Sequence, residues 1–570
     1  MKLKKQSPQT FEQSAVILLA STIIVKLIGA VFKIPLQRLI GTLGFGYFSS
    51  AYDLFLPIYA LSMAGLPIAV SRIVAENVAA ERYKEAKKTF SVAQKAFLVT
   101  GFTGLIVILC AIFPYVKATT SDTQSAKYIA LCIAAVAPSI LFCCLMSSFR
   151  GYYEGMRNML PTAISDIIEA LGKLVLGLGF AYTVLKLTGD VALAAAGALA
   201  GIMIGTVLST LYLWLRQKIV GDPISENMLK SSPDSRSGKV VLSCLLTIAI
   251  PVALSSLANN LTLIIDTFMI KLQLKNIMES SYDVIASMYA NAIADYNATA
   301  KQLLSADNMP TFLYGIRGEA YTLYNLIPTL TTTLGIGAIP VLTTAWVKNE
   351  KSAIKSNIEK ILRTTAIIAI PAGIGVLSIS PYLMDLLYGD VASVEIGSIM
   401  LRILGVAAIF SGISVPITSM LQAIGKPFVP LFNIAVGAVL KIIVNILLVG
   451  QPRINIIGAP VGTTVCYFYI FVSNMICLIK YSHIVPDFKS TLIKPLISGI
   501  GCGIAAFFVS KWLNAVGMST VIITAVSIAV AVVVYFSLIF ALKTLTEEDV
   551  KDFPKGEKIA ALLLKLRLIK

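Results

Sequence analysis

The chain has 570 residues, of which 57% are hydrophobic and only 14% are charged. Soluble domains carry about 25% charged residues, so this composition excludes an ordinary soluble fold. A formal net charge of +17 fits either nucleic-acid binding or the charge asymmetry of a membrane protein, and the positions of the basic residues decide between them.

Apolar blocks recur along the chain with lengths of about 20 to 27 residues, enough for a helix to cross ~30 Å of hydrocarbon. They lack the period-two alternation of barrel strands, and a helix pairs its own backbone groups in lipid. We therefore predict an all-α integral membrane protein with about 14 transmembrane helices. The predicted spans are 14–40, 46–76, 90–114, 125–149, 161–185, 190–215, 240–270, 314–345, 361–380, 392–421, 428–450, 457–479, 495–510 and 518–542.

Basic residues gather in the loops of one side. Lys2, Lys4 and Lys5 precede the first span, and the clusters 82–88 and 348–360 follow even-numbered spans. The positive-inside rule makes this side cytoplasmic, and an even number of helices returns the C-terminus to it. Topology thus explains the net charge. We predict a multi-pass protein of a bacterial cell membrane with both termini cytoplasmic and no nucleic-acid partner.

The residues that most catalytic and metal sites require are scarce. The chain has one histidine, His483, and eight cysteines that lie in or near apolar spans without a C-x-x-C motif. Neither a histidine-based catalytic set nor a zinc site can be assembled from them. We therefore predict that the protein is not an enzyme and holds no metal or organic cofactor.

A weak internal repeat divides the chain. Corresponding segments lie ~260 to 275 positions apart and have the same predicted direction, so the repeat is parallel, as in transporters that bind substrate between two halves. Small residues at these positions let helices approach closely. The matching pairs are 65–71 with 338–344, 148–161 with 420–430, and 197–201 with 458–462.

The repeat predicts two pseudo-repeated six-helix lobes followed by two extra helices. The lobes are 1–225 and 239–485, helices 13 and 14 occupy 490–543, and 544–570 is a basic amphipathic tail on the anionic inner leaflet. The second lobe contains an external insertion at 272–313 with helix-like apolar spacing. It is interpreted either as a cap over the outer mouth or as an inert interfacial helix.

Ionisable residues at membrane depth are the candidate site, because burying a charge in lipid is costly. Lys26 and Lys33 lie two turns apart on one face of the first helix and predict an anion site; internal ion pairing is the alternative. Arg317 would extend this basic surface. Asp53 and Glu319 are the candidate counter-charges, and Asp53 has an equally good interpretation as a structural counter-ion to a nearby base.

Two further groups of polar residues lie within spans. Asp166, Glu169 and Lys173 share the fifth span, where the Glu-to-Lys spacing of four favours a self-contained structural pair. A possible cation or coupling site combines side chains of the seventh and eleventh spans, whose oxygen atoms suit Na⁺. Its residues are Asn259, Asp266, Lys441 and Asn445. The alternative is that the ammonium group of Lys441 occupies the place of the cation.

Several motifs resemble those of a known family. The segments Arg150-Gly-Tyr-Tyr-Glu-Gly-Met-Arg-Asn-Met-Leu-Pro161 and Leu421-Gln-Ala-Ile-Gly-Lys-Pro427 resemble the polysaccharide flippase branch of the multidrug/oligosaccharidyl-lipid/polysaccharide (MOP) exporter superfamily. The stretch from Val25-Lys-Leu-Ile-Gly29 to Gly65-Leu-Pro-Ile-Ala-Val-Ser71 resembles the stage V sporulation protein B and lipid II flippase group. The resemblance covers nearly the whole chain.

The resemblance implies two lobes in a V shape, alternating access and a basic central cavity for a lipid diphosphate. Lys26 takes the family's first-helix basic position, with Lys in place of Arg, and Lys33 and Arg317 match further cavity positions approximately. Helices 13 and 14 would form a groove for the lipid tail. The sequence departs from the family pattern on helix 2, where 62–65 replaces an additional arginine, and Lys loses the bidentate phosphate geometry of Arg.

We therefore expect a flippase that moves an undecaprenyl-diphosphate-linked saccharide, lipid II or a related polysaccharide unit, to the outer leaflet, coupled to Na⁺, H⁺ or the membrane potential. Two alternatives remain. One is a cation-coupled multidrug exporter of the same superfamily, which needs acidic cavity residues. The other is a non-transporting scaffold for envelope or spore-wall synthesis, with envelope-synthesis enzymes as partners.

Overall fold

The computed structural model describes residues 11–63, 65–299 and 302–545. Their regular elements are helices, with no strand among them. The basic N-terminal residues and the predicted tail from residue 546 lie outside this description, as does the side chain of Asn259. The all-α prediction is confirmed.

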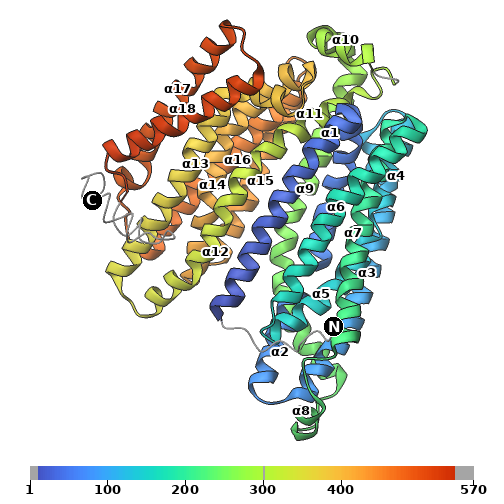
Figure 1. Cartoon of the computed structure of the whole chain (residues 1–570), viewed down its shortest axis with the longest axis vertical. Coiled ribbons are helices and arrows are strands. Elements are labelled where there is room, and N and C mark those ends of the chain that lie inside the picture. Colours follow the sequence, from blue (N-terminus) through green and yellow to red (C-terminus); the bar gives the residue numbers. More distant parts are fainter. Residues whose placement is uncertain (1–10, 64, 300–301, 546–570) are drawn as a thin grey trace. The chain divides into compact units, whose positions relative to one another are not determined.

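The helices follow one another with short connections (Figure 1). Their bounds are α1 Phe11–Met63, α2 Leu66–Ala79, α3 Tyr83–Thr119, α4 Thr123–Val136, α5 Ser139–Gly155, α6 Leu160–Thr188, α7 Val191–Val220, α8 Glu226–Ser231, α9 Gly238–Met288, α10 Ala290–Thr299, α11 Met309–Tyr324, α12 Leu326–Val347, α13 Lys351–Leu387, η1 Ser393–Gly397, α14 Ser398–Ala423, α15 Phe428–Val449, η2 Asn455–Ile457, α16 Gly458–Ser482, η3 Lys489–Ile493, α17 Lys494–Ala515 and α18 Thr520–Ala541.

Ten helical segments of the described chain are long and apolar enough to cross a bilayer. Each coincides with a span predicted from the sequence, although Lys351–Leu387 begins ten residues before the predicted span 361–380. The total of about 14 stays a prediction, because the remaining predicted spans lie in α1, α2, α9, α11 and α12, which are not among these ten segments. The ten segments are Tyr83–Thr119, Thr123–Gly155, Leu160–Thr188, Val191–Val220, Lys351–Leu387, Ser393–Ala423, Phe428–Val449, Asn455–Ser482, Lys489–Ala515 and Thr520–Ala541.

The predicted second span, 46–76, is not one continuous helix. The chain bends at Gly41 inside α1 (φ 69°), and the helix stops at Met63. Gly65 has φ 82° and lies so close to α9 that an added Cβ atom would be 2.2 Å from the carbonyl oxygen of Ala249. Glycine is needed here because it accepts positive φ and has no side chain to clash. Hydropathy alone does not reveal such a break.

The contacts divide the chain into two compact units. Unit 1 comprises residues 1–278 and 304–315, and unit 2 comprises 279–303 and 316–570. The sequence places the lobe boundary in the polar loop near 225–239, whereas the first 41 residues of α9 pack with unit 1. Packing therefore groups the helices differently from the order of the repeat.

The same small-residue packing recurs in both units. In unit 1, α6 and α7 lie side by side (Figure 1), and an added Cβ atom at Gly201 would be 2.5 Å from the backbone of Gly177. In unit 2, α16 packs on α15, where a Cβ atom at Gly462 would be 2.3 Å from Asn445 Oδ1. These two glycines end the repeated Gly-x-x-x-Gly motifs, so each motif brings its helix against the preceding one.

The insertion predicted at 272–313 is largely helical. Its first part continues α9, and α10 follows after Met288. Within unit 2, Tyr289 donates a 2.7 Å hydrogen bond to Asn455 Oδ1, and Asp295 accepts one of 3.4 Å from the backbone of Val391. Hydrogen bonds at Tyr289 and Asp295 thus attach the end of α9 and helix α10 to the rest of unit 2.

Two ion pairs join the loop after α7 to the start of α3. Lys84 Nζ lies 2.8 Å from Asp234 Oδ1, and Arg236 forms an ion pair with Glu85, a carboxylate that is 3% exposed. The hydrogen bond from Lys84 lowers the pKa of Asp234, and the one to Glu85 raises the pKa of Arg236. These contacts hold the short helix α8 beside the basic end of α3.

Replacing Gly201 by Val should destabilise unit 1 by about 1–3 kcal/mol, because the new side chain would overlap the backbone of α6. The melting temperature of the purified protein, followed by intrinsic fluorescence in detergent, measures the effect. Gly179→Ala on α6 is the matched control, since nothing lies within 4 Å of its added Cβ atom. Equal melting temperatures for the two variants would contradict close packing at Gly201.

Candidate functional site

Unit 1 contains a polar cavity between α1, α5, α6 and α7. Its volume is about 300 Å³. Charged and tyrosine side chains form one part of its wall and apolar side chains the rest. The lining residues are Val25, Gly29, Tyr52, Phe55, Leu56, Tyr59, Arg150, Asp166, Glu169, Ala170, Lys173, Ile202 and Thr206.

Arg150 is the central charge of this cavity. Its Nη1 lies 2.7 Å from Asp166 Oδ1 and its Nη2 lies 3.1 Å from Glu169 Oε2, while its Nε donates a 2.9 Å hydrogen bond to Ser165 Oγ. The guanidinium is 14% exposed, so these partners compensate a charge that is largely withdrawn from solvent. The sequence favoured pairing of Glu169 with Lys173. That interpretation is wrong, because Arg150 on the neighbouring helix α5 pairs with the Glu169 carboxylate instead.

Lys173 faces a different partner. Its Nζ donates a 2.9 Å hydrogen bond to Tyr52 Oη and lies 4.7 Å from the centre of the Tyr52 ring. Lys33 Nζ lies 5.6 Å from the centre of the same ring. Two cations of α1 and α6 therefore meet at one tyrosine. The spacing of residues within α6 gives no indication of this approach, because Lys33 lies on a different helix.

Lys26 lies on α1 two turns before Lys33 and is half-buried. Its neighbours Val25 and Gly29 line the cavity, although Lys26 itself does not. The missing side chain at Gly29 leaves open space, with nothing within 4 Å of an added Cβ atom. The predicted anion site thus has Lys33 beside the cavity and Lys26 farther along the same helix.

Asp53 belongs to a separate cluster of unit 1. It accepts a 2.8 Å hydrogen bond from Tyr314 Oη. The ring of Tyr314 lies 5.1 Å from Lys271 Nζ, and the ring of Tyr115 lies 5.5 Å from the same atom. Lys271 is 1% exposed, and its ammonium group rests between two aromatic faces, which attract a cation. Lys271 directly follows the predicted seventh span, so hydropathy places it outside the membrane and does not reveal its burial.

Arg317 and Glu319 belong to unit 2. Arg317 is 6% exposed and its guanidinium lies 4.3 Å from the centre of the Tyr321 ring. Glu319 is fully buried and accepts a hydrogen bond from Ser393 Oγ. Within unit 2 they form a buried polar cluster on α11. The predicted continuation of the basic surface from Lys33 to Arg317 stays a prediction.

The predicted cation site draws on both units. Asp266 is buried in unit 1 and is 2% exposed. Lys441 and Asn445 lie one turn apart on α15 in unit 2 and are 8% and 0% exposed. Each half is withdrawn from solvent, as a coupling site requires, and the joint site stays a prediction.

Comparison with known proteins identifies relatives over nearly the full length. The family model of polysaccharide biosynthesis proteins matches residues 11–347, and the MatE model matches 318–447. The chain is 23% identical to stage V sporulation protein B of Bacillus subtilis (strain 168) over 96% of this chain and 98% of that protein. It is also 23% identical to the lipid II flippase MurJ of the same organism, over 95% of this chain and 97% of the relative.

Solved structures share the fold. A lipid II flippase MurJ in an inward closed conformation superimposes with a TM-score of 0.63 and 15% identity, covering 92% of this chain and 98% of that one. An inward-facing multidrug resistance MATE family transporter of the MOP superfamily gives 0.58 and 16%, covering 82% and 99%. Both are multi-pass transporters, so the fold expected from the motifs is confirmed.

Replacing Arg150 by Gln should destabilise unit 1 by about 3–5 kcal/mol, since Asp166 and Glu169 would be left buried without a compensating charge. Thermal unfolding of the purified protein measures this loss. Adding Asp166→Asn and Glu169→Gln should restore much of the stability, because neutral amides remove the uncompensated charge. Arg157→Gln, at an exposed position, is the control; a loss as large as that of Arg150→Gln would refute the compensation at Arg150.

Proposed function

We propose that this chain, which belongs to the polysaccharide biosynthesis protein family of the MOP superfamily, moves an undecaprenyl-diphosphate-linked saccharide from the inner to the outer leaflet. Lipid II and related polysaccharide units are the substrates of this class. One observation carries the proposal, the meeting of Lys33 and Lys173 at Tyr52. The lobes would expose the site to one side of the membrane at a time.

The charges of this cluster suit a diphosphate. Lys173 has its hydrogen bond to a neutral phenol and is not paired with a carboxylate among the described residues. Its ammonium and that of Lys33 can each donate several hydrogen bonds to phosphate oxygens. An isolated diphosphate would be strongly disfavoured in hydrocarbon, so compensating cations are the main requirement for its passage.

An apolar groove in unit 2 suits the lipid tail. It has a volume of about 490 Å³ and lies between α11–α13 and the pair α17 and α18. Pro371, Ala372 and Gly375 on α13 form one wall, and Ile528, Ala531, Val532 and Phe536 on α18 form the opposite one. A polyprenyl chain could lie in this groove while its headgroup is carried, because the tail gains nothing by leaving an apolar environment.

The membrane potential can supply energy for this direction of transport. Moving one elementary charge across 100 mV changes the free energy by about 2.3 kcal/mol. A negatively charged headgroup that moves outward from an inside-negative cell therefore moves downhill. Coupling to Na⁺ or H⁺ through Asp266, Lys441 and Asn445 is the second part of the proposal.

Drug export through the same cavity is the less favoured function. A cationic drug needs carboxylates that are available to it, and the cavity does contain Asp166 and Glu169. Arg150 pairs with both of them, however, so a positive charge already occupies the place where the drug would bind. The remaining charges at Tyr52 are positive and repel a cation.

Substituting Lys33 and Lys173 by Gln should slow flipping at least tenfold, because each lysine contributes a charge-assisted hydrogen bond worth about 1.5–3 kcal/mol. The measurement uses proteoliposomes with a fluorescent undecaprenyl-diphosphate saccharide and an external membrane-impermeant quencher. Lys186→Gln on the exposed end of α6 is the matched control. A wild-type flipping rate in the double variant would exclude Lys33 and Lys173 as the anion site. A separate Lys26→Gln variant tests whether Lys26, farther along α1, also contributes to flipping.

Filling the groove should affect only substrates with a long tail. Ala531→Trp on α18 would occupy the space of a polyprenyl chain, so transport of the full-length lipid should fall severalfold while a short-chain analogue is moved at the wild-type rate. The same assay compares both substrates. Val533→Trp, on the exposed side of α18, is the control and should leave both rates unchanged. Equal slowing of the two substrates by Ala531→Trp would argue against a tail groove.

A further inference from the structure

The cavity at Tyr52 also contains two carboxylates that the binding of a diphosphate does not require. Asp166 and Glu169 line it together with Lys173, and all three lie on one face of α6. Measured along the helix axis, their positions lie about 10 and 6 Å before that of the lysine. The cavity therefore has a basic part at Lys173 and an acidic part closer to the start of α6.

Each carboxylate keeps one oxygen atom available to a ligand. Arg150 lies 2.7 Å from Asp166 Oδ1 and 3.1 Å from Glu169 Oε2, so the guanidinium occupies one oxygen of each. Asp166 Oδ2 accepts no hydrogen bond from the described residues. Glu169 Oε1 has distant hydroxyl partners, Tyr59 at 3.4 Å and Thr206 at 3.5 Å, whereas a hydroxyl bonded to a carboxylate lies about 2.5–2.7 Å away.

These oxygen atoms are accessible within the cavity. The side chains of Asp166 and Glu169 are 23% and 24% exposed, although they belong to an apolar helix long enough to span the membrane. Because both residues line the cavity, this exposed area faces its interior. A ligand in the cavity can therefore reach two strong hydrogen-bond acceptors.

Another wall of the cavity is aromatic. The rings of Tyr52, Phe55 and Tyr59 follow one another along α1, with centroids 6.0 and 5.2 Å apart, and all three residues line the cavity. A pyranose sugar has an apolar face of C–H groups and an edge of hydroxyl groups. It is therefore best bound where an aromatic surface lies beside hydrogen-bond acceptors, as in this cavity.

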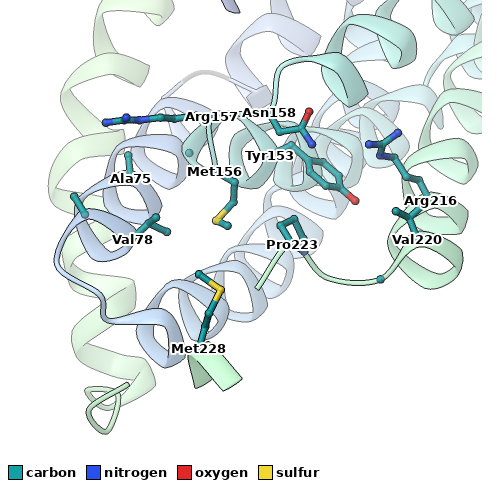
Figure 2. Close-up of a pocket in the computed structure, with 13 residues that line it drawn as sticks. Ala75, Val78, Tyr153, Met156, Arg157, Asn158, Arg216, Val220, Pro223 and Met228 are labelled. Carbon is teal, nitrogen blue, oxygen red and sulfur yellow. The ribbon is translucent and has the colours of Figure 1, made fainter. Parts of the chain in front are cut away.

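The second cavity of unit 1 differs in this respect. It lies between α2, the α5–α6 corner, the end of α7 and α8, and Met156 and Met228 point toward each other across it (Figure 2). Arg157 and Arg216 lie at its opposite ends, and none of the described residues that line it is a carboxylate. The combination of carboxylates with an aromatic wall thus distinguishes the cavity at Tyr52.

We propose that Asp166 and Glu169 bind the sugar attached directly to the diphosphate by accepting hydrogen bonds from its hydroxyl groups, while the aromatic rings of α1 receive its apolar face. The inference rests on the proposed function, because Lys33 and Lys173 must hold the diphosphate. Neutral hydroxyl groups are the donors that fit. A second phosphate group would meet the negative carboxylates, and an ammonium group would meet Arg150 and the lysines. The carboxylates are therefore specificity-determining residues for a saccharide-linked lipid.

Two short-chain probes test this assignment on the purified full-length chain. One is geranyl diphosphate, and the other is geranyl diphosphate with a single glucose on its terminal phosphate. Isothermal titration calorimetry gives both dissociation constants. In Asp166→Asn, Arg150 should hold the amide oxygen and direct the NH₂ group, a donor, to the place of the acceptor. The glucose-linked probe should then bind about tenfold more weakly. Geranyl diphosphate should bind more tightly, because one negative charge is removed.

A second variant and a matched control complete the experiment. Glu169→Gln should give the same pattern, and each variant leaves Arg150 one carboxylate, so the buried charge stays compensated. Asp234→Asn, at a side chain 98% exposed in the loop after α7, should bind both probes as the wild type does.

Two outcomes would overturn the sugar site. One is unchanged binding of the glucose-linked probe in both variants. The other is a change of the same sign for both probes, because an altered charge or fold alone would affect the two diphosphates alike. If the wild type bound neither probe, the proposed diphosphate site itself would be wrong. The two failures are therefore distinguishable.

Discussion

The cost of an uncompensated charge at membrane depth is the constraint on which unit 1 depends. Arg150 meets it by pairing with Asp166 and Glu169, which lie on the next helix. This pairing determines the character of the cavity. Because the guanidinium takes both carboxylates, Lys173 turns to Tyr52 and adds its charge to that of Lys33. A cavity whose lining includes two carboxylates thereby presents a basic side to a substrate.

Close packing of small residues makes this arrangement possible. Gly201 and Gly177 bring α6 and α7 into backbone contact, and Gly155 lies against α2, where an added Cβ atom would be 2.7 Å from the carbonyl oxygen of Ser71. In lipid, helices gain little from hydrophobic association, so such contacts supply much of the attraction between them. The same corner that carries Gly155 continues into Arg157 and Asn158. The motif that begins at Arg150 therefore serves both the ionic centre and the helix packing.

The two units suit chemically different parts of the proposed substrate. Unit 1 contains the lysines at Tyr52, which suit a diphosphate, and unit 2 contains the apolar groove beside α17 and α18, which suits a long hydrocarbon tail. A lipid-linked saccharide has both parts. Neither feature alone distinguishes a flippase from another transporter of the superfamily, and their presence in one chain favours a substrate that is anionic at one end and apolar at the other.

The sequence by itself determined the helical membrane fold, the positions of most spans and the parallel repeat, because hydropathy and the spacing of small residues are properties of single helices that a linear pattern contains. Tertiary structure decided the partners. Spacing of four predicted that Glu169 would pair with Lys173, yet Arg150 is 19 positions before that carboxylate and reaches it from another helix. It also decided the break at Gly65 and the burial of Lys271. Contacts between helices depend on distances in space that a linear sequence pattern does not contain. The partner of a buried charge therefore becomes known only from the tertiary structure.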